Sequence, residues 1–204
     1  HLEIVKVTNI LLAALMAFVP ITPPSTESAP DVATSAATTQ VEFVDLSAEQ
    51  VEIATWAVGL YHEDGLGLPA VTFVYHGDDT DACEGWLGVH EVIEGRSVIG
   101  ICTSRTTPQI ETLFVHELAH AWCAHSLQDE RRSDFQELRS CPVWRGDVPW
   151  HERGAEQAAE ILRGGLDDRA VGVVTINDHG CDALEAGYRA LTGDAPLHGY
   201  RDNC

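Results

Sequence analysis

Two histidines and a glutamate in the middle of the chain have the spacing of a metal site. His116, Glu117 and His120 form the pattern His-Glu-x-x-His. Residues four apart on a helix lie about one turn apart on the same face, so both imidazoles can bind one zinc ion. Glu117 projects ~100° away from His116, where its carboxylate can take a proton from a water on the metal. The pattern indicates metal-assisted hydrolysis.

The alternative is a pair of ordinary hydrogen-bonded histidines on a buried helix. The neighbouring residues favour the metal site, because they supply an apolar surface that can bury the helix and hold both imidazoles in place. These residues are Leu113, Phe114, Val115, Leu118, Ala119 and Trp122.

A catalytic zinc ion needs a third protein ligand and one open position. The metzincin pattern is excluded, because Cys123 and Ser126 stand where that class has glycine and histidine. A glutamate from a later helix, predicted over residues 152–163, is the remaining source. Glu156 and Glu160 lie on one face of that helix, so one can bind zinc while the other accepts a hydrogen bond from a ligand imidazole. A pair of solvated glutamates is the alternative.

The combined pattern resembles the gluzincin metallopeptidases, a thermolysin-like group of zinc enzymes. The resemblance covers roughly residues 71–166, and the run HELAHAW…WHERGAEQAAEIL is also similar to a group of small secreted actinobacterial proteins. It implies that Glu117 is the general base and that Glu160 orients the first histidine. It also implies one zinc ion with three ligands, His116, His120 and Glu156. Two departures are Glu rather than Asp at 160 and Ala155 in place of the family's asparagine.

The resemblance implies hydrolysis of peptide bonds in a peptide or protein substrate, by a zinc-activated water. A further donor should stabilise the oxyanion. The candidates for this donor are His151, His179, Tyr188, His198 and Tyr200. The alternative for each is an ordinary surface or core residue, which is the more common case. An extended substrate could pair with an edge strand, as in gluzincins, within residues 86–92 or 97–102.

The elements that must position these residues follow from local signals. A capping box at Ser47–Gln50 predicts a helix to about His62. A strand is predicted over 71–76, and the apolar runs 86–92 and 97–102 predict a hairpin. Thr107-Pro108 predicts the start of the site helix, which runs to about Leu127.

Three further helices are predicted after the site helix. They cover residues 133–139, 152–163 and 181–191, and Gly164-Gly165 is expected to end the second of them. The order of elements predicts an α+β fold. With the resemblance, we expect a small zincin-like domain in which a short antiparallel sheet or hairpin packs on the site helix.

The first 40 residues differ from the rest. Ile10–Val19 is apolar but shorter than the ~20 residues of a membrane span, which is typical of a secretory signal. An uncleaved anchor and a buried helix remain alternatives, because Pro20 interrupts the run and no small-x-small cleavage site follows. The predicted organisation is a signal or anchor over 1–19, a Pro/Ser/Thr/Ala linker over 20–40 and a metallopeptidase-like domain over 41–204. The protein is therefore expected to be secreted.

Charge excludes several functions. The chain has 12 basic and 32 acidic residues and a formal net charge of −20. Such a surface argues against binding nucleic acid or an anionic membrane, because both require clustered cations. It weakly favours basic or neutral peptide substrates, although solvation is the commoner reason for an acidic surface.

Six cysteines allow 15 pairings. A signal-like start favours disulfides, and the order along the chain suggests Cys83–Cys102, Cys123–Cys141 and Cys181–Cys204. Metal binding by cysteine is the alternative, but the chain has no Cys-x-x-Cys pair.

The function predicted from these observations is a secreted zinc metallopeptidase. One alternative is a zinc-binding module without catalysis, which the presence of Glu117 argues against. The other is an extracellular interaction protein in which the pattern is incidental. One zinc ion per chain would favour the metallopeptidase or the zinc-binding module over the interaction protein.

Overall fold

The computed structural model describes residues 39–104, 108–167, 176–177 and 179–200. Contacts divide the chain into residues 1–36 and 37–204, and all elements below belong to the second unit. The predicted signal segment and nearly all of the predicted linker lie outside the described residues. The elements are β1 (Val41–Val44), α1 (Ala48–Glu63), β2 (Val71–Tyr75), β3 (Gly88–Ile93), β4 (Arg96–Ile101), α2 (Pro108–His125), α3 (Asp129–Leu138), α4 (Gly154–Leu166) and α5 (Cys181–Thr192), with 3₁₀ turns η1 (Thr80–Cys83) and η2 (Trp150–Glu152).

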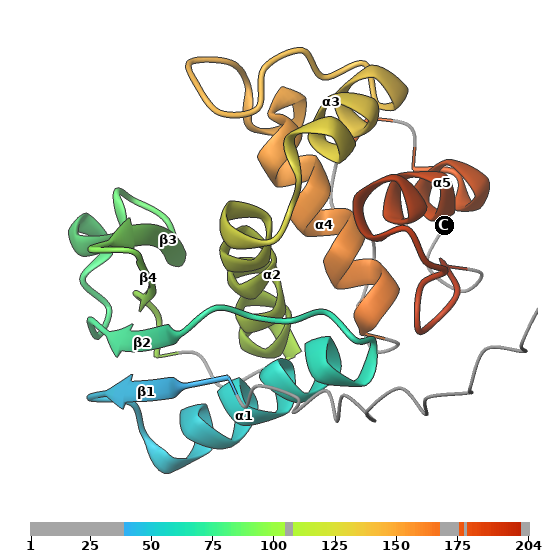
Figure 1. Ribbon diagram of the computed structural model, residues 1–204. Helices are drawn as coiled ribbons and strands as arrows, with labels where there is room; N and C mark the ends of the chain where they lie inside the picture. The colour runs from blue at the N-terminus through green and yellow to red at the C-terminus, as the bar shows by residue number, and fades with distance from the viewer. Residues whose placement is uncertain (1–38, 105–107, 168–175, 178, 201–204) are drawn as a thin grey trace, which may run out of the picture. The chain divides into compact units, whose positions relative to one another are not determined.

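The four strands form one sheet in the order β1-β2-β4-β3. The predicted α+β class is confirmed, but the expected antiparallel sheet is wrong, because β1, β2 and β4 run parallel and only β3 is antiparallel. The sequence analysis missed β1, and α1 is the crossover helix that lets β1 and β2 run in the same direction. β3 lies at the edge of the sheet (Figure 1).

The predicted hairpin is confirmed as β3 and β4. Ile93 pairs with Arg96, and the two residues between them, Glu94 and Gly95, have φ values of 51° and 80°. Positive φ at both positions gives the tight turn whose twist matches that of the strands. The hairpin places β3 beside the site helix α2.

Helices α1 and α2 bury one face of the sheet (Figure 1). Phe73 and Ile99 point into the same core as Phe114 of α2, and all three are fully buried. The buried hydroxyl of Tyr61 in α1 donates to the backbone oxygen of Val115 at 2.9 Å, which ties the two helices together. The predicted capping box is present at Ser47.

Helix α4 extends beyond its predicted end. Gly164 and Gly165 were expected to stop it, but both are helical and buried. A Cβ atom at Gly165 would lie 2.5 Å from the ring of Tyr188 in α5. The glycine therefore allows close packing of α5 on α4, and this packing outweighs its low helix propensity.

One predicted disulfide is confirmed, between Cys83 and Cys102. The predicted Cys123–Cys141 bond is wrong, because both cysteines are free and buried. A Cβ atom at Gly154 would lie 3.3 Å from the Cys141 sulfur, so that thiol packs against the first residue of α4. Cys181 is disulfide-bonded, and its predicted partner Cys204 lies outside the described residues.

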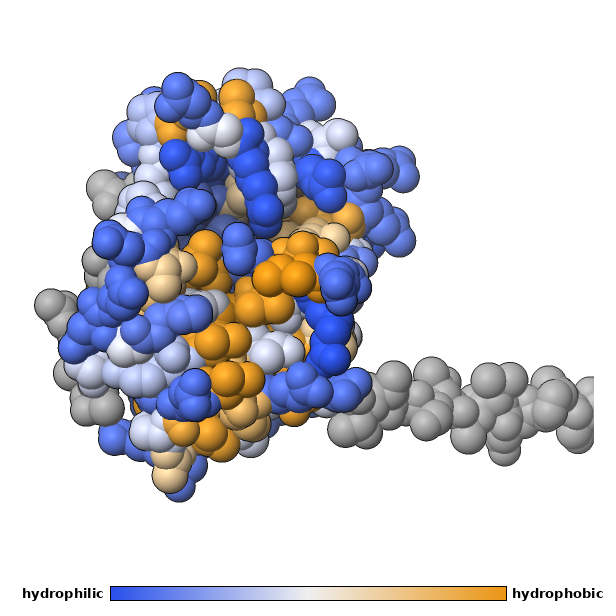
Figure 2. Space-filling view, turned by 90° about the vertical axis from the view of Figure 1, so that its left-hand side faces the viewer, coloured by the Kyte–Doolittle hydropathy of each residue, from blue (hydrophilic) through white to orange (hydrophobic). Residues whose placement is uncertain are grey.

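No helix among the described residues combines the length and the apolar character needed to span a membrane. The face that carries the sheet nevertheless shows a band of apolar residues (Figure 2). Several large apolar side chains of the strands and of the segment before β3 are exposed, namely Phe43, Val44, Trp86, Leu87, Val92 and Ile93.

Candidate metal centre

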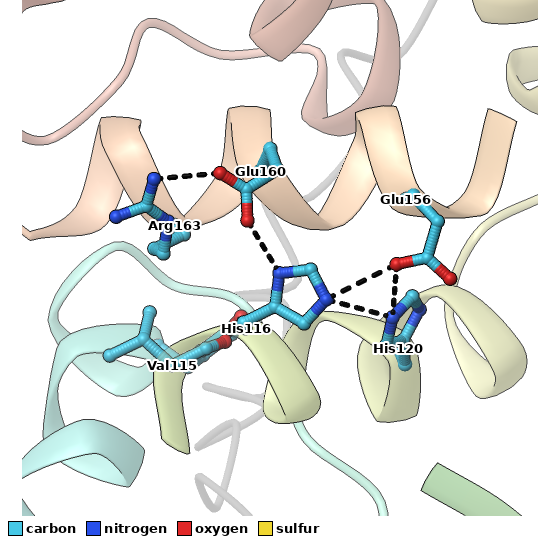
Figure 3. Close-up of polar contacts among 7 residues, drawn as sticks. Val115, His116, His120, Glu156, Glu160 and Arg163 are labelled. Atoms are coloured by element: carbon cyan, nitrogen blue, oxygen red, sulfur yellow. Dashed lines mark hydrogen bonds and ion pairs between the residues drawn. The ribbon is translucent and has the colours of Figure 1, made fainter. Parts of the chain in front are cut away.

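The candidate site lies between α2 and α4, which run side by side (Figure 3). His116 and His120 project from α2 toward α4, and Glu156 and Glu160 project from α4 toward α2. Each pair is four residues apart, so the helical repeat alone aligns two side chains on each facing surface. The sequence predicted this convergence, and the structure brings the four residues together.

Three of these side chains converge on one point. The Nε2 atoms of His116 and His120 are 3.1 Å apart, and each lies 3.3 Å from Oε2 of Glu156. Ligands of a tetrahedral zinc ion, each bound at ~2.0–2.1 Å, are ~3.3 Å from one another. The donor set could therefore hold a metal ion without rearrangement.

Glu160 fixes the orientation of the first histidine. Its Oε1 accepts a hydrogen bond at 2.8 Å from Nδ1 of His116, and its Oε2 lies 2.7 Å from the fully buried Arg163 (Figure 3). With the proton on Nδ1, the lone pair of Nε2 points toward Glu156. This is the arrangement by which outer carboxylates select the metal-binding tautomer.

His120 has less support. Its Nδ1 atom is buried and has no hydrogen-bond partner among the described residues. Ala155 of α4, the departure from the gluzincin pattern noted in the sequence, is buried and has no polar side chain. The two histidines thus differ, and His116 is the better-oriented candidate ligand.

The electrostatics favour a cation at the site. Burial raises the pKa of Glu156, but hydrogen bonds with His116 and His120 outweigh it and lower this pKa well below its usual range. Burial also opposes ionisation of Glu160, yet His116 and Arg163 lower its pKa. Burial lowers the pKa of His116, but hydrogen bonds to Glu156 and Glu160 raise it to about 10. Both carboxylates are therefore ionised and face a point where positive charge is stabilised.

Glu117 lies beside this cluster and is 5% exposed. Burial is the main cause that raises its pKa. A Cβ atom at Gly88 of β3 would lie 2.8 Å from Oε1 of Glu117, so glycine lets the carboxylate lie in this position against the edge strand, and a larger residue would displace it. Sequence reasoning missed Gly88, because nothing in the local pattern tells which strand residue faces Glu117.

The site opens into a cleft of about 530 Å³. Its walls come from the segment leading into β3, from α2, and from the segment that joins α3 to α4. Besides the candidate ligands, it is lined by apolar and charged residues that include Trp86, Leu87, His90, Arg145, Trp150 and Arg153. Trp150 stacks on His116 with ring centroids 6.2 Å apart, which covers one side of the imidazole.

His90 was also missed by the sequence analysis. Its ring stacks near that of His120, with centroids 6.4 Å apart, and its Nε2 lies 2.9 Å from Oγ of Ser97. Burial, followed by the charge of His120, lowers the pKa of His90 to about 3, so it is neutral near pH 7. The alternation of β3 could have placed His90 on the same face as Gly88, but only if the bounds of the strand had been known.

The structure brings none of the five oxyanion candidates to the cleft within the described residues. Tyr188 is buried and donates to Asp64, and Tyr200 donates to the backbone oxygen of Ile161. The other three lie at partly or fully exposed positions outside the cleft lining, namely His151, His179 and His198. None of the five candidates is therefore placed to contact a ligand in the cleft.

The chain matches no protein-family model, no curated protein and no solved structure. Functional inference therefore depends on the geometry and chemistry of the cleft.

Proposed function

We propose that this protein is a secreted zinc metallopeptidase of the gluzincin type, with a zincin-like domain, that hydrolyses peptide bonds. One observation carries the proposal. The ligand atoms of His116, His120 and Glu156 converge at tetrahedral spacing beside a buried glutamate, Glu117, in an open cleft. A structural zinc site is typically closed by four protein ligands, whereas a catalytic site keeps a position open.

The donor set supports zinc. Two imidazoles and one carboxylate form the ligand set of several catalytic zinc sites. The same set also suits ferrous iron in oxygenases, so metal analysis must identify the ion. The disulfide Cys83–Cys102 supports an oxidising compartment and thus secretion.

The metal ion and the residues of the cleft have different roles in the proposed reaction. When bound, zinc supplies a Lewis acid that polarises the scissile carbonyl and makes water more acidic. Glu117 accepts the proton of the attacking water on its carboxylate and delivers it to the leaving amine. Its raised pKa suits this role, because a more basic carboxylate is a better proton acceptor. Glu160 holds His116 in the binding tautomer throughout.

The edge strand supports an extended substrate. β3 pairs with β4 on one side and with no other strand in the described part of the chain. Its free backbone edge can add a peptide as a further strand. Gly88 and Val89 of β3 line the cleft, so a peptide paired there would pass the metal centre.

The first test measures metal content in the full chain and in Glu156→Ala. We expect one zinc ion per wild-type chain and loss of zinc from the variant, because a ligand is missing. Glu137→Ala, which removes an exposed glutamate on α3, should retain zinc. A folded wild-type chain that binds no zinc would overturn the proposal.

The second test measures hydrolysis of a peptide library by the wild type and by Glu117→Gln. The variant should keep its zinc ion while kcat/KM falls by about 10²–10⁴-fold, the usual contribution of a general base. Zinc without any hydrolysis in the wild type would instead identify a non-catalytic zinc module.

A further inference from the structure

Two arginines in the wall of the cleft differ from four of the six other arginines that the structure describes. Four arginines form ion pairs with a carboxylate at 3.0 Å or less, namely Arg96, Arg132, Arg163 and Arg189. Arg145 and Arg153 line the cleft, and neither forms an ion pair with a carboxylate of the described residues. In a chain of net charge −20, two cations at the proposed active site that pair with no described carboxylate call for an explanation.

Arg153 is anchored at the start of α4. It immediately precedes the first residue of the helix and lies three residues before Glu156. Its Nε donates to the backbone oxygen of Val148 at 3.1 Å, so the backbone of the preceding loop fixes the guanidinium group. Its two terminal nitrogens have no hydrogen-bond partner among the described residues. They remain available to a ligand in the cleft.

Arg145 lies in the segment between α3 and η2 and is exposed. It lines the same cavity as His90 of β3, and its charge contributes to the lowered pKa of that histidine. The guanidinium group is therefore near the wall formed by β3. No hydrogen bond joins it to another described residue, so a ligand would meet no competing partner.

Four glutamates line the cleft, and none of them forms an ion pair with Arg145 or Arg153 within the described residues. Glu156 faces the two histidines of the candidate metal centre, and Glu160 is paired with His116 and Arg163. Glu117 lies beside the metal centre, and Glu84 lies in the segment before β3. Charges on the outer surface act over longer distances and are screened beyond ~8 Å at physiological salt. At contact distance in a partly buried cleft, an arginine attracts an anion several times more strongly than in bulk water.

We propose that Arg145 and Arg153 form a carboxylate-binding subsite, so that the cleft selects peptides with a carboxylate near the cleaved bond. The proposal rests on the proposed peptidase function and names its substrate class. The planar guanidinium group binds a carboxylate through two parallel hydrogen bonds. The apolar side chains of Trp86, Leu87 and Trp150 line the same cleft and can cover the carbon atoms of the bound residue. This preference is opposite to the one that the net charge of the chain favours.

The carboxylate can belong to an aspartate or glutamate side chain or to the free C-terminus of a peptide. Matched peptides separate these sources: one pair differs only in Glu or Gln beside the cleaved bond, and another only in a free or amidated C-terminus. The zinc-loaded full chain should cleave the acidic member of one pair with a kcat/KM about 10- to 100-fold higher, the range expected for hydrogen bonds to a charged group.

Arginine variants test the residues directly. Arg145→Gln and Arg153→Gln should each bring the ratio of kcat/KM for the acidic peptide to kcat/KM for the neutral peptide toward one. Arg145→Glu should reverse the preference in favour of a lysine-containing peptide. The matched control is Arg189→Gln, which removes an exposed arginine of α5 outside the cleft and should keep the wild-type preference.

A binding measurement separates this inference from the peptidase proposal. Zinc-loaded Glu117→Gln is mixed with fluorescently labelled acidic and neutral peptides, and anisotropy gives the two Kd values. Tighter binding of the acidic peptide that is lost in the arginine variants supports the subsite, whether or not the wild type cleaves any peptide. If the wild type cleaves nothing, only the peptidase proposal fails. Equal affinities, no binding of either peptide, or cleavage without acidic preference would overturn the subsite.

Discussion

The two sides of α2 are held by different interactions. Toward the sheet and α1, α2 presents apolar side chains such as Phe114 and Leu118, which are fully buried. Toward α4 it presents His116 and His120, which face carboxylates. The same helix thus contributes to an apolar core on one side and to a charged cluster on the other.

This difference indicates which side serves stability and which serves function. Burial of apolar surface stabilises the fold without further requirements. Buried charges cost desolvation free energy that their attraction only partly returns, so a buried ionic cluster is weak evidence for stability. Arg163 and Glu160 form such a cluster, yet its geometry matches what a metal ligand requires. Shifted pKa values concentrated on one side of a helix are typical of functional sites.

The largest effect on stability is expected on the apolar side. Phe114→Ala should lower the free energy of unfolding by about 3–5 kcal/mol, because it leaves a cavity in the core. Urea denaturation of the metal-free protein measures it. Phe43→Ala is the matched control, since Phe43 is 37% exposed on β1 and should cost much less. Equal losses in the two variants would show that the proposed core side does not dominate stability.

A smaller effect is expected on the polar side, and on a different quantity. Glu160→Gln should weaken zinc binding by about 10- to 100-fold, because His116 loses the carboxylate that fixes its tautomer. Competition with a chromogenic chelator gives the affinity. Exposed Glu185→Gln on α5 is the control and should bind zinc as the wild type does. If Glu160→Gln bound zinc normally, Glu160 would belong to the framework of the fold and not to the metal centre.

The same division explains what the sequence could predict. The capping box at Ser47, the hairpin turn and the four-residue spacing of the candidate ligands are local patterns, and the structure confirms them. Zinc binding and catalysis stay predictions. The cluster of candidate ligands could be predicted because the two histidines lie on one helix and the two glutamates on another. Only the packing of these two helices against each other had to be assumed.

Features set by distant contacts were not predictable. β1 is four residues long, and its parallel pairing with β2 depends on the crossover through α1. Gly165 continues a helix because Tyr188 packs on it from another helix. Whether Cys123 and Cys141 form a disulfide depends on how α2, which carries Cys123, and the segment with Cys141 beside the start of α4 pack in the core. Arg145 comes from a loop with no regular pattern, and the helix predicted over residues 152–163 does not by itself place Arg153 in the cleft.

A third effect concerns His90, which lies where the sheet meets the candidate metal centre. Its pKa is lowered to about 3, mainly by burial and then by the charges of His120, Arg145 and His125, whereas 6.5 is expected in the unfolded chain. Between these values the unfolded chain binds a proton that the folded chain does not, so the free energy of unfolding falls as the pH decreases. Above pH 6.5 this contribution no longer changes.

The slope tests this assignment in the metal-free protein. Between pH 6 and pH 4 the wild type should lose up to about 1.4 kcal/mol more per pH unit than His90→Gln, the limit for one titrating group. Urea denaturation at several pH values gives both slopes, and the subtraction removes the contribution of the carboxylates common to both proteins. Exposed His62→Gln serves as the control and should keep the wild-type slope. Equal slopes for the wild type and His90→Gln would mean that His90 takes up a proton as readily as an exposed histidine. In that case β3 would pack less tightly on α2 than the stacking of His90 near His120 indicates.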